Sequence, residues 1–111
     1  MLKLILLCGV FVASASSECN VGIPGCSCPV SYRMVQCNGI GFTRIPQIQG
    51  ALDSLTLWFN QIEAVRDEDV DDLTIDVLDL RVQATGRGCV RNDLTKPPRM
   101  IIYGLCPEVR R

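Results

Sequence analysis

The sequence predicts a small, mostly β fold with irregular arcs, in which short parallel strands stack as coils of a solenoid behind a disulfide-braced N-terminal cap. Two observations lead to this fold class. Leu55 and Leu57 recur as Leu78 and Leu80 at an offset of 23 residues, and a period of about 20 to 50 residues is typical of repeat architectures. A cluster of four cysteines precedes the repeat, where cross-links can stabilise a thin core.

The first fifteen residues have the features of a secretory signal peptide. Lys3 precedes an apolar run over residues 4–13, and Ala13-Ser14-Ala15 is the small-residue pattern after which signal peptidase cuts. The run is shorter than the about 20 residues that cross a bilayer; a buried core helix is the alternative. Because Asp76 and Asp79 interrupt the best later candidate, we expect a signal peptide at 1–15, a secreted, extracellular mature chain and no membrane insertion.

Six cysteines remain once Cys8 leaves with the signal peptide. An even number of cysteines in an oxidising compartment indicates three disulfides, although many pairings are open. Zinc is the alternative, but the chain has no His, and Cys26-Ser27-Cys28 lacks the usual two-residue spacer. We therefore expect no metal and no other cofactor. The six cysteines are Cys19, Cys26, Cys28, Cys37, Cys89 and Cys106.

Residues 16–50 are predicted to form the cysteine-rich cap. Prolines and glycine interrupt the cysteine cluster, so this stretch is not a helix. Residues 32–36 alternate as a short strand does. The segment 38–48 is rich in Gly and is predicted to be a turn with two or three inward apolar anchors.

Residues 51–83 contain about two repeats. Leu-x-Leu at period two predicts a short strand with one buried face. We expect Asn60, just after the first strand, to point inward and bond backbone groups of neighbouring turns. Two chance amphipathic stretches are the alternative. The arc that leads from the first strand back to the start of the second is expected to fill the same core with its apolar residues, namely Ile62, Val65, Val70 and Leu73.

Residues 19–80 resemble the N-terminal cap and first turns of extracellular leucine-rich-repeat proteins. The resemblance implies a cap β-hairpin that shields the first open edge of the solenoid. It also implies the pairs Cys19–Cys28 and Cys26–Cys37, which leaves Cys89 and Cys106 to each other. The motifs that carry it are Cys19-x6-Cys26-x-Cys28-x8-Cys37, then Ile45-Pro46, then Leu52-x-x-Leu55-x-Leu57-x-x-Asn60-x-Ile62.

The chain departs from that family at three places. Gln83 stands where the second copy should have Asn, so we predict an irregular turn there. The repeats end after about two, whereas at least three usually make a stable stack. The tail at 84–111 lacks the four cysteines of the usual C-terminal cap. We expect it to be a disulfide-bridged C-terminal segment in which residues 99–105 add one more strand.

Charge and composition argue against an enzyme and against nucleic-acid binding. With no His in the chain, the common Ser-His-Asp and Cys-His catalytic groups are absent. Acidic residues gather at 63–72 and basic ones at 81–111, and we expect two solvated faces rather than a nucleic-acid site. The acidic run fails the EF-hand pattern, because Asp72 and Leu78 stand where Gly and Glu are required.

Protein recognition is the function that the sequence favours. If the repeated leucines face the core, the residues between them face the other way, and Trp and Arg dominate interface energetics. An uncovered strand at the open solenoid edge would also allow a homodimer or docking on a larger repeat protein. We predict that an extracellular protein binds the concave sheet face through Ser54, Thr56, Trp58, Val77, Asp79 and Arg81.

Other interpretations stay open at this point. A small cysteine-rich effector, such as a protease inhibitor or a toxin-like peptide, would act through the loops at 21–25 and 90–99. A truncated copy of a longer receptor is a third interpretation. Within the predicted patch, Trp58 could instead pack on Phe59 or the cap, and Asp79 and Arg81 could simply be solvated.

Overall fold

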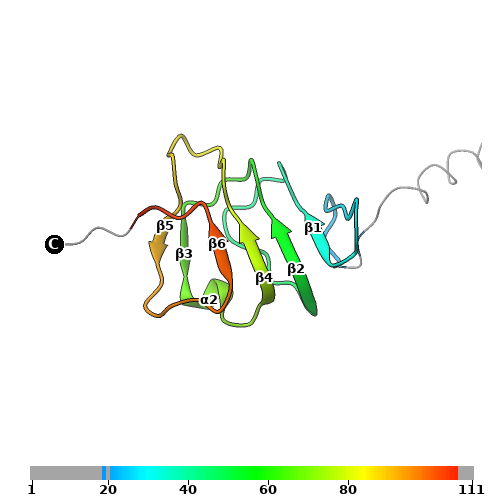
Figure 1. Ribbon diagram of the computed structural model, residues 1–111. Coiled ribbons are helices and arrows are strands. Elements are labelled where there is room, and N and C mark those ends of the chain that lie inside the picture. Colours follow the sequence, from blue (N-terminus) through cyan, green and yellow to red (C-terminus); the bar gives the residue numbers. More distant parts are fainter. Residues whose placement is uncertain (1–18, 20, 108–111) are drawn as a thin grey trace, which may run out of the picture.

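The computed structural model describes residues 19 and 21–107 as two parallel sheets joined by irregular arcs (Figure 1). The predicted signal peptide lies outside these residues. The main sheet has the strand order β1-β2-β4-β6, and the second sheet pairs β3 with β5. No helix in the described part of the chain is long and apolar enough to cross a membrane. The elements are β1 (Met34–Gln36), β2 (Ala51–Thr56), β3 (Ala64–Arg66), α2 (Asp67–Val70), β4 (Thr74–Asp79), β5 (Arg91–Asp93) and β6 (Ile101–Tyr103).

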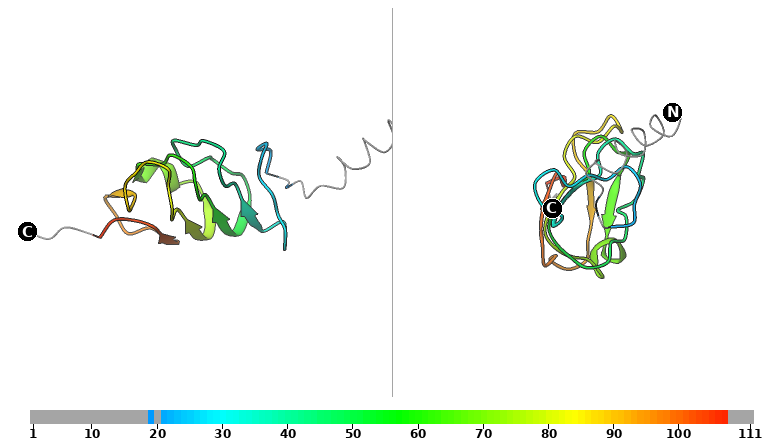
Figure 2. Two further views of the ribbon diagram at one scale, coloured as in Figure 1. Left: turned by 90° about the horizontal axis from the view of Figure 1, so that it is seen from above. Right: turned by 90° about the vertical axis from the view of Figure 1, so that its right-hand side faces the viewer.

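The chain winds as a solenoid of about three turns, and this confirms the predicted fold class. Each coil passes from the main sheet on one side to the arcs and the second sheet on the other (Figure 2). Leu55 lies beside Leu78 in parallel pairing, at the predicted offset of 23. Ile102 of β6 lies beside Leu78 in turn, so the tail adds a strand to the main sheet as expected.

The core runs along the solenoid axis and is filled from matching positions of successive coils. Val35, Leu55 and Leu78 are fully buried at paired positions of three neighbouring strands. Cys37, Leu57 and Leu80, which follow these strands, form a second buried column. The returning arcs contribute the apolar residues expected from the sequence, and all four are buried: Ile62, Val65, Val70 and Leu73.

The cap is built onto the main sheet. Its strand β1 pairs in parallel with β2, while the hairpin implied by the resemblance is reduced to a bridge between Ser27 and Gln36, with two N–H to O distances of 2.8 Å. Disulfides join Cys19 to Cys28 and Cys26 to Cys37. Because Cys37 is fully buried, the cap is cross-linked directly to the core.

The C-terminal end is closed by the tail. Cys89 is bonded to Cys106, and the Cys106 N–H donates to the Val90 carbonyl at 2.8 Å. The three disulfides join the pairs that the resemblance implies. Three disulfides in so short a chain indicate an oxidising environment.

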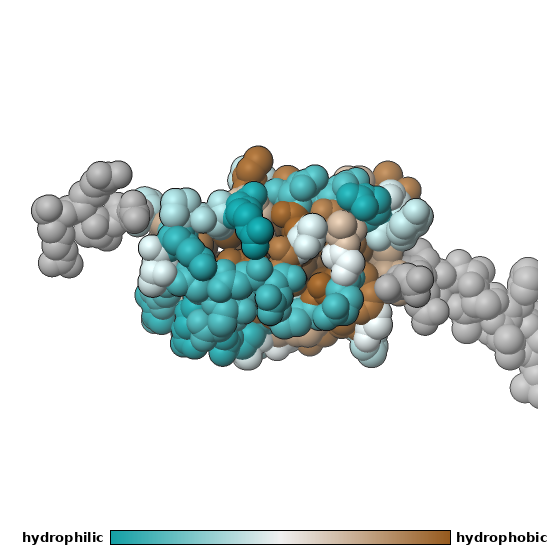
Figure 3. Space-filling model, turned by 90° about the horizontal axis from the view of Figure 1, so that it is seen from below, coloured by the Kyte–Doolittle hydropathy of each residue, from teal (hydrophilic) through white to brown (hydrophobic). Residues whose placement is uncertain are grey.

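The acidic run and the basic tail contact each other at the surface, so they are exposed to solvent as expected but are not separate faces. The Thr95 N–H donates to the Asp67 carboxylate at 3.1 Å, and hydrogen bonds from Thr95 lower the pKa of Asp67. Lys96 and Arg99 both reach Asp71, at 3.6 Å to its carboxylate and 3.3 Å to its carbonyl oxygen. Figure 3, which views this lower edge, shows hydrophilic side chains over most of the half nearer the C-terminus.

Candidate partner-binding surface

The outer face of the main sheet carries two rows of side chains that cross the strands. Three residues predicted from the sequence, Ser54, Thr56 and Val77, lie on this face and are half-buried. The more exposed apolar area comes from residues that sequence reasoning missed, because they lie on strands outside the two recognised copies. The rows are Met34, Ser54, Val77 and Ile101, and then Gln36, Thr56, Asp79 and Tyr103.

An arginine flanked by two aromatic rings stands at the upper end of this face. The Arg81 guanidinium lies 5.8 Å from the ring centroid of Trp58 and 5.2 Å from that of Tyr103, within the range of cation–π attraction. The Asp79 carboxylate accepts from Arg81 Nε at 2.9 Å and from its terminal nitrogen at 2.7 Å. The guanidinium is therefore fixed in place, although 55% of the Arg81 side chain is exposed.

Asp79 differs from the other residues of the predicted patch because it is buried, with 8% of its surface exposed. Burial alone raises its pKa, but the hydrogen bonds and charge of Arg81, together with the nearby Trp58 indole, lower it below the usual value. Asp79 thus stays ionised and orients Arg81. It offers little surface of its own to a partner, so its predicted part in binding stays a prediction that would act through Arg81.

Trp58 has one polar group without a full partner. Its backbone N–H donates to the Asn38 side chain at 2.9 Å, which ties it to the cap. Its indole Nε1 is buried and meets no acceptor with good hydrogen-bond geometry among the described residues. It nevertheless lies close enough to the Asp79 carboxylate to help lower the pKa of Asp79.

A glycine lets the tail approach this cluster. Gly104 follows Tyr103 with a φ of +103°, a conformation that glycine adopts readily. A Cβ at Gly104 would lie 2.8 Å from the Arg81 backbone nitrogen. Any side chain here would push Tyr103 away from Arg81.

The turns behind this cluster are held by polar side chains inside the solenoid. Asn60 is fully buried, and its Oδ1 accepts from the N–H groups of residues 40, 41 and 42 at 2.8 to 3.1 Å. Its Nδ2 donates to the carbonyls of Cys37, Leu57 and Trp58 at 2.9 to 3.2 Å. The inward, backbone-bonding role expected of Asn60 is confirmed.

Gln83 takes the equivalent place in the next coil. Its Nε2 donates to the Leu57 and Leu80 carbonyls at 2.8 and 2.9 Å, and its Oε1 accepts from Ile62 N–H at 3.1 Å. The replacement of Asn by Gln therefore keeps contacts between coils, with two hydrogen bonds to the preceding coil in place of four. Unlike Asn60, Gln83 is half-buried.

Two apolar residues stand out from the same turns. Phe59 and Val82 have φ angles of +59° and are 57% and 58% exposed. The Phe59 N–H donates to the Val82 carbonyl at 2.7 Å, and Gly39, with a φ of +66°, donates likewise to Trp58. Sequence reasoning missed this pair, although the repeat offset aligns the two positions.

The remaining cavities lie away from this surface. One of about 290 Å³ is lined by Val70, Leu94, Pro98 and Met100 beside the acidic run. The described residues contain no group of three or more His, Cys, Asp or Glu that could hold a metal ion.

Comparisons with protein-family models, curated proteins and solved structures find no match to this chain.

Proposed function

We propose that the protein is a secreted, non-enzymatic recognition module of the leucine-rich-repeat kind, which binds an extracellular protein through the outer face of its main sheet. The observation that carries this proposal is the Arg81 guanidinium, held between Trp58 and Tyr103. Arginine, tryptophan and tyrosine supply most binding hot spots. A guanidinium that is already fixed loses less conformational entropy on binding than a free side chain does.

Three further features support the proposal. The apolar leader and the disulfides fit passage through an oxidising secretory route. The repeated leucine positions, the Asn60 network and the pairing of the cap cysteines accord with the leucine-rich-repeat resemblance. The lack of His in the chain argues against the common nucleophilic catalysts.

The alternative effector would act through free cysteine-flanked loops. Part of the loop at 90–99 is strand β5, which pairs with β3, and Thr95 is bonded to Asp67. A loop held in this way offers less backbone to a protease or channel than an inhibitor requires. We therefore favour the sheet face over the loops.

The test begins with immobilised oxidised protein, which is cross-linked to a partner in extracellular fluid so that the partner can be identified. The affinity of that partner is then measured for the double variant Trp58→Ala, Arg81→Ala. We expect a loss of at least about a hundredfold, since two central hot-spot side chains are removed.

Arg91→Ala is the matched control. Arg91 is also ion-paired with an aspartate two residues away, at 3.0 Å, and its side chain is 54% exposed, but it lies on the second sheet. We expect this variant to bind normally. Unchanged affinity in a folded double variant, or an equal loss in the control, would refute the proposed surface.

A further inference from the structure

The turns that follow β1, β2 and β4 form one edge of the solenoid, at the top of Figure 1. We call residues 38–43, 58–61 and 81–88 the turn edge. Ile40, Phe59 and Val82 project from its three turns as exposed apolar side chains. The two in the left-handed conformation are strained there, because glycine and asparagine occupy that region far more readily than a β-branched or bulky residue.

This strain is not required by the fold. The first turn places Gly39 in the left-handed conformation at the corresponding position, and its N–H also donates to a carbonyl of the next turn, that of Trp58. Phe59 and Val82 therefore destabilise the fold in two ways: through their strained backbone conformation and through the exposure of apolar side chains to water. Such residues in a native structure indicate a surface that is covered in use.

The charged residues of the turn edge indicate what kind of surface covers it. It contains Arg81, which is ion-paired with the neighbouring Asp79 at 2.7 Å, and Arg87, which has no ion pair among the described residues, whereas residues 67–76 at the opposite edge contain six acids. Strands of six residues separate the two edges by roughly 20 Å. That is more than twice the Debye length of about 8 Å at physiological salt, so the acids do not repel an anion at the turn edge.

Apolar tips, aromatic rings just behind them and Arg87, which has no ion pair among the described residues, match the interface of an anionic bilayer, where Trp and Tyr sit at headgroup level. We propose that the turn edge rests on an anionic lipid surface, with Ile40, Phe59 and Val82 at the acyl boundary and Arg87 among the headgroups. No spanning segment is needed for this contact. It goes beyond the proposed function and meets the proposed protein-binding surface only at Trp58 and Arg81, which belong to both.

The chain's single tryptophan makes the test direct, because Trp58 precedes Phe59 in the turn. The oxidised, secreted protein is added to vesicles of phosphatidylcholine and phosphatidylserine in equal amounts, and to phosphatidylcholine alone. Its N-terminus is determined first, because a retained apolar leader would bind lipid by itself. We expect co-sedimentation and a blue shift of Trp58 emission with the mixed vesicles, and much weaker effects with the neutral ones.

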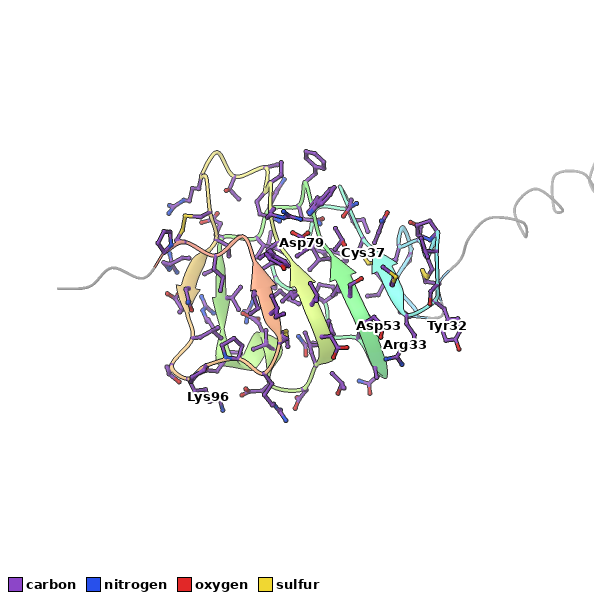
Figure 4. The ribbon with its side chains drawn as sticks, viewed as in Figure 1. Tyr32, Arg33, Cys37, Asp53, Asp79 and Lys96 are labelled. Carbon is purple, nitrogen blue, oxygen red and sulfur yellow. A yellow bond between two sulfur atoms is a disulfide. The ribbon has the colours of Figure 1, made fainter. Side chains whose placement is uncertain are left out.

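The deciding variant is Phe59→Asn, Val82→Asn. Asparagine tolerates the left-handed conformation, so the thermal midpoint should not fall, while vesicle partitioning should fall by at least about tenfold because two apolar tips are lost. Tyr32→Ser is the matched control. It removes a side chain that is 74% exposed at the lower end of the cap, away from the turn edge (Figure 4), and should leave partitioning unchanged.

Two results would overturn the proposal. One is a wild-type protein that does not bind mixed vesicles, including the case in which it self-associates through Phe59 instead. The other is a folded Asn variant that partitions as wild type does. Trp58 and Arg81 lie where the turn edge meets the outer face of the main sheet, but the Phe59, Val82 variant changes neither of them, so the two proposals can fail separately.

Discussion

The two turns that follow β2 and β4 occupy equivalent places in neighbouring coils but are stabilised to different degrees. Asn60 is fully buried and makes six hydrogen bonds, four of which reach the preceding coil, whereas Gln83 is half-buried and makes three. The N-terminal half therefore has a dense polar interior. The C-terminal half, where Gln83 lies, instead has the Cys89–Cys106 disulfide and the Asp79–Arg81 ion pair.

The comparison teaches how a short solenoid can be stable. A stack of few repeats has two ends at which the core is open to water, and each end needs a closing structure. At one end that structure is a cap whose Cys37 enters the core, and at the other it is a cross-linked strand. Substitutions in each half should therefore have effects of different size.

The largest effect is expected for Asn60→Ala. The change leaves three backbone N–H groups and the Cys37 carbonyl without this partner, while Gln83 and Gly39 still donate to the Leu57 and Trp58 carbonyls. Each lost hydrogen bond contributes about 0.5 to 1.5 kcal/mol. We expect the free energy of unfolding to fall by about 4 kcal/mol or more, measured by urea denaturation. A loss below about 1 kcal/mol would show that water replaces the network at no cost.

Removing the Cys89–Cys106 bridge should have the next largest effect. A cross-link with a sequence separation of 17 residues contributes about 3 kcal/mol by restricting the unfolded chain. We expect Cys89→Ala, Cys106→Ala to lose about that amount, and full reduction of the wild-type protein to unfold it. An unchanged thermal midpoint in reductant would contradict the role given to the disulfides.

Gln83→Ala sharpens the comparison with Asn60→Ala. It removes three hydrogen bonds from a half-exposed site where water can replace some of them. We expect a loss of about 1 to 2 kcal/mol under the same denaturation conditions. A loss equal to that of Asn60→Ala would mean that the two turns contribute alike.

The smallest effect concerns pH and Asp79. Its folded pKa lies below the unfolded value, so its contribution to stability is complete at neutral pH and is lost as the pH falls from about 4 through the lowered pKa. We expect Asp79→Asn to unfold at a lower urea concentration at pH 7 and to depend less on pH in acid. Equal acid slopes for the variant and wild type would contradict this role.

Much of the fold could be predicted from the sequence, because it depends on local patterns. The register of β2 and β4 was predictable from Leu55 and Leu78, because both leucines must point to the buried face of the same sheet. The tail strand was foreseen near residues 99–105. Its register against β4 was not, because no leucine pair marks it, and so Tyr103 was missed as a neighbour of Arg81.

The candidate site was predicted only in part. Alternation along a strand places Ser54 and Val77 on the outer face, but it does not reveal how far a side chain is buried. Asp79 is buried because Arg81 folds back over it, and that depends on the tail packing beside it. The left-handed Phe59 and Val82 could not be foreseen from propensity, because both residues disfavour that conformation.

Native-state hydrogen exchange on the Cys89→Ser, Cys106→Ser variant tests most directly whether the two halves are stabilised separately. We expect amides of β5 and β6 to exchange at least about tenfold faster than in the wild type, while those of β1 and β2 keep their protection, because local opening follows local contacts. Equal loss of protection in all strands, or no loss in β5 and β6, would contradict this division.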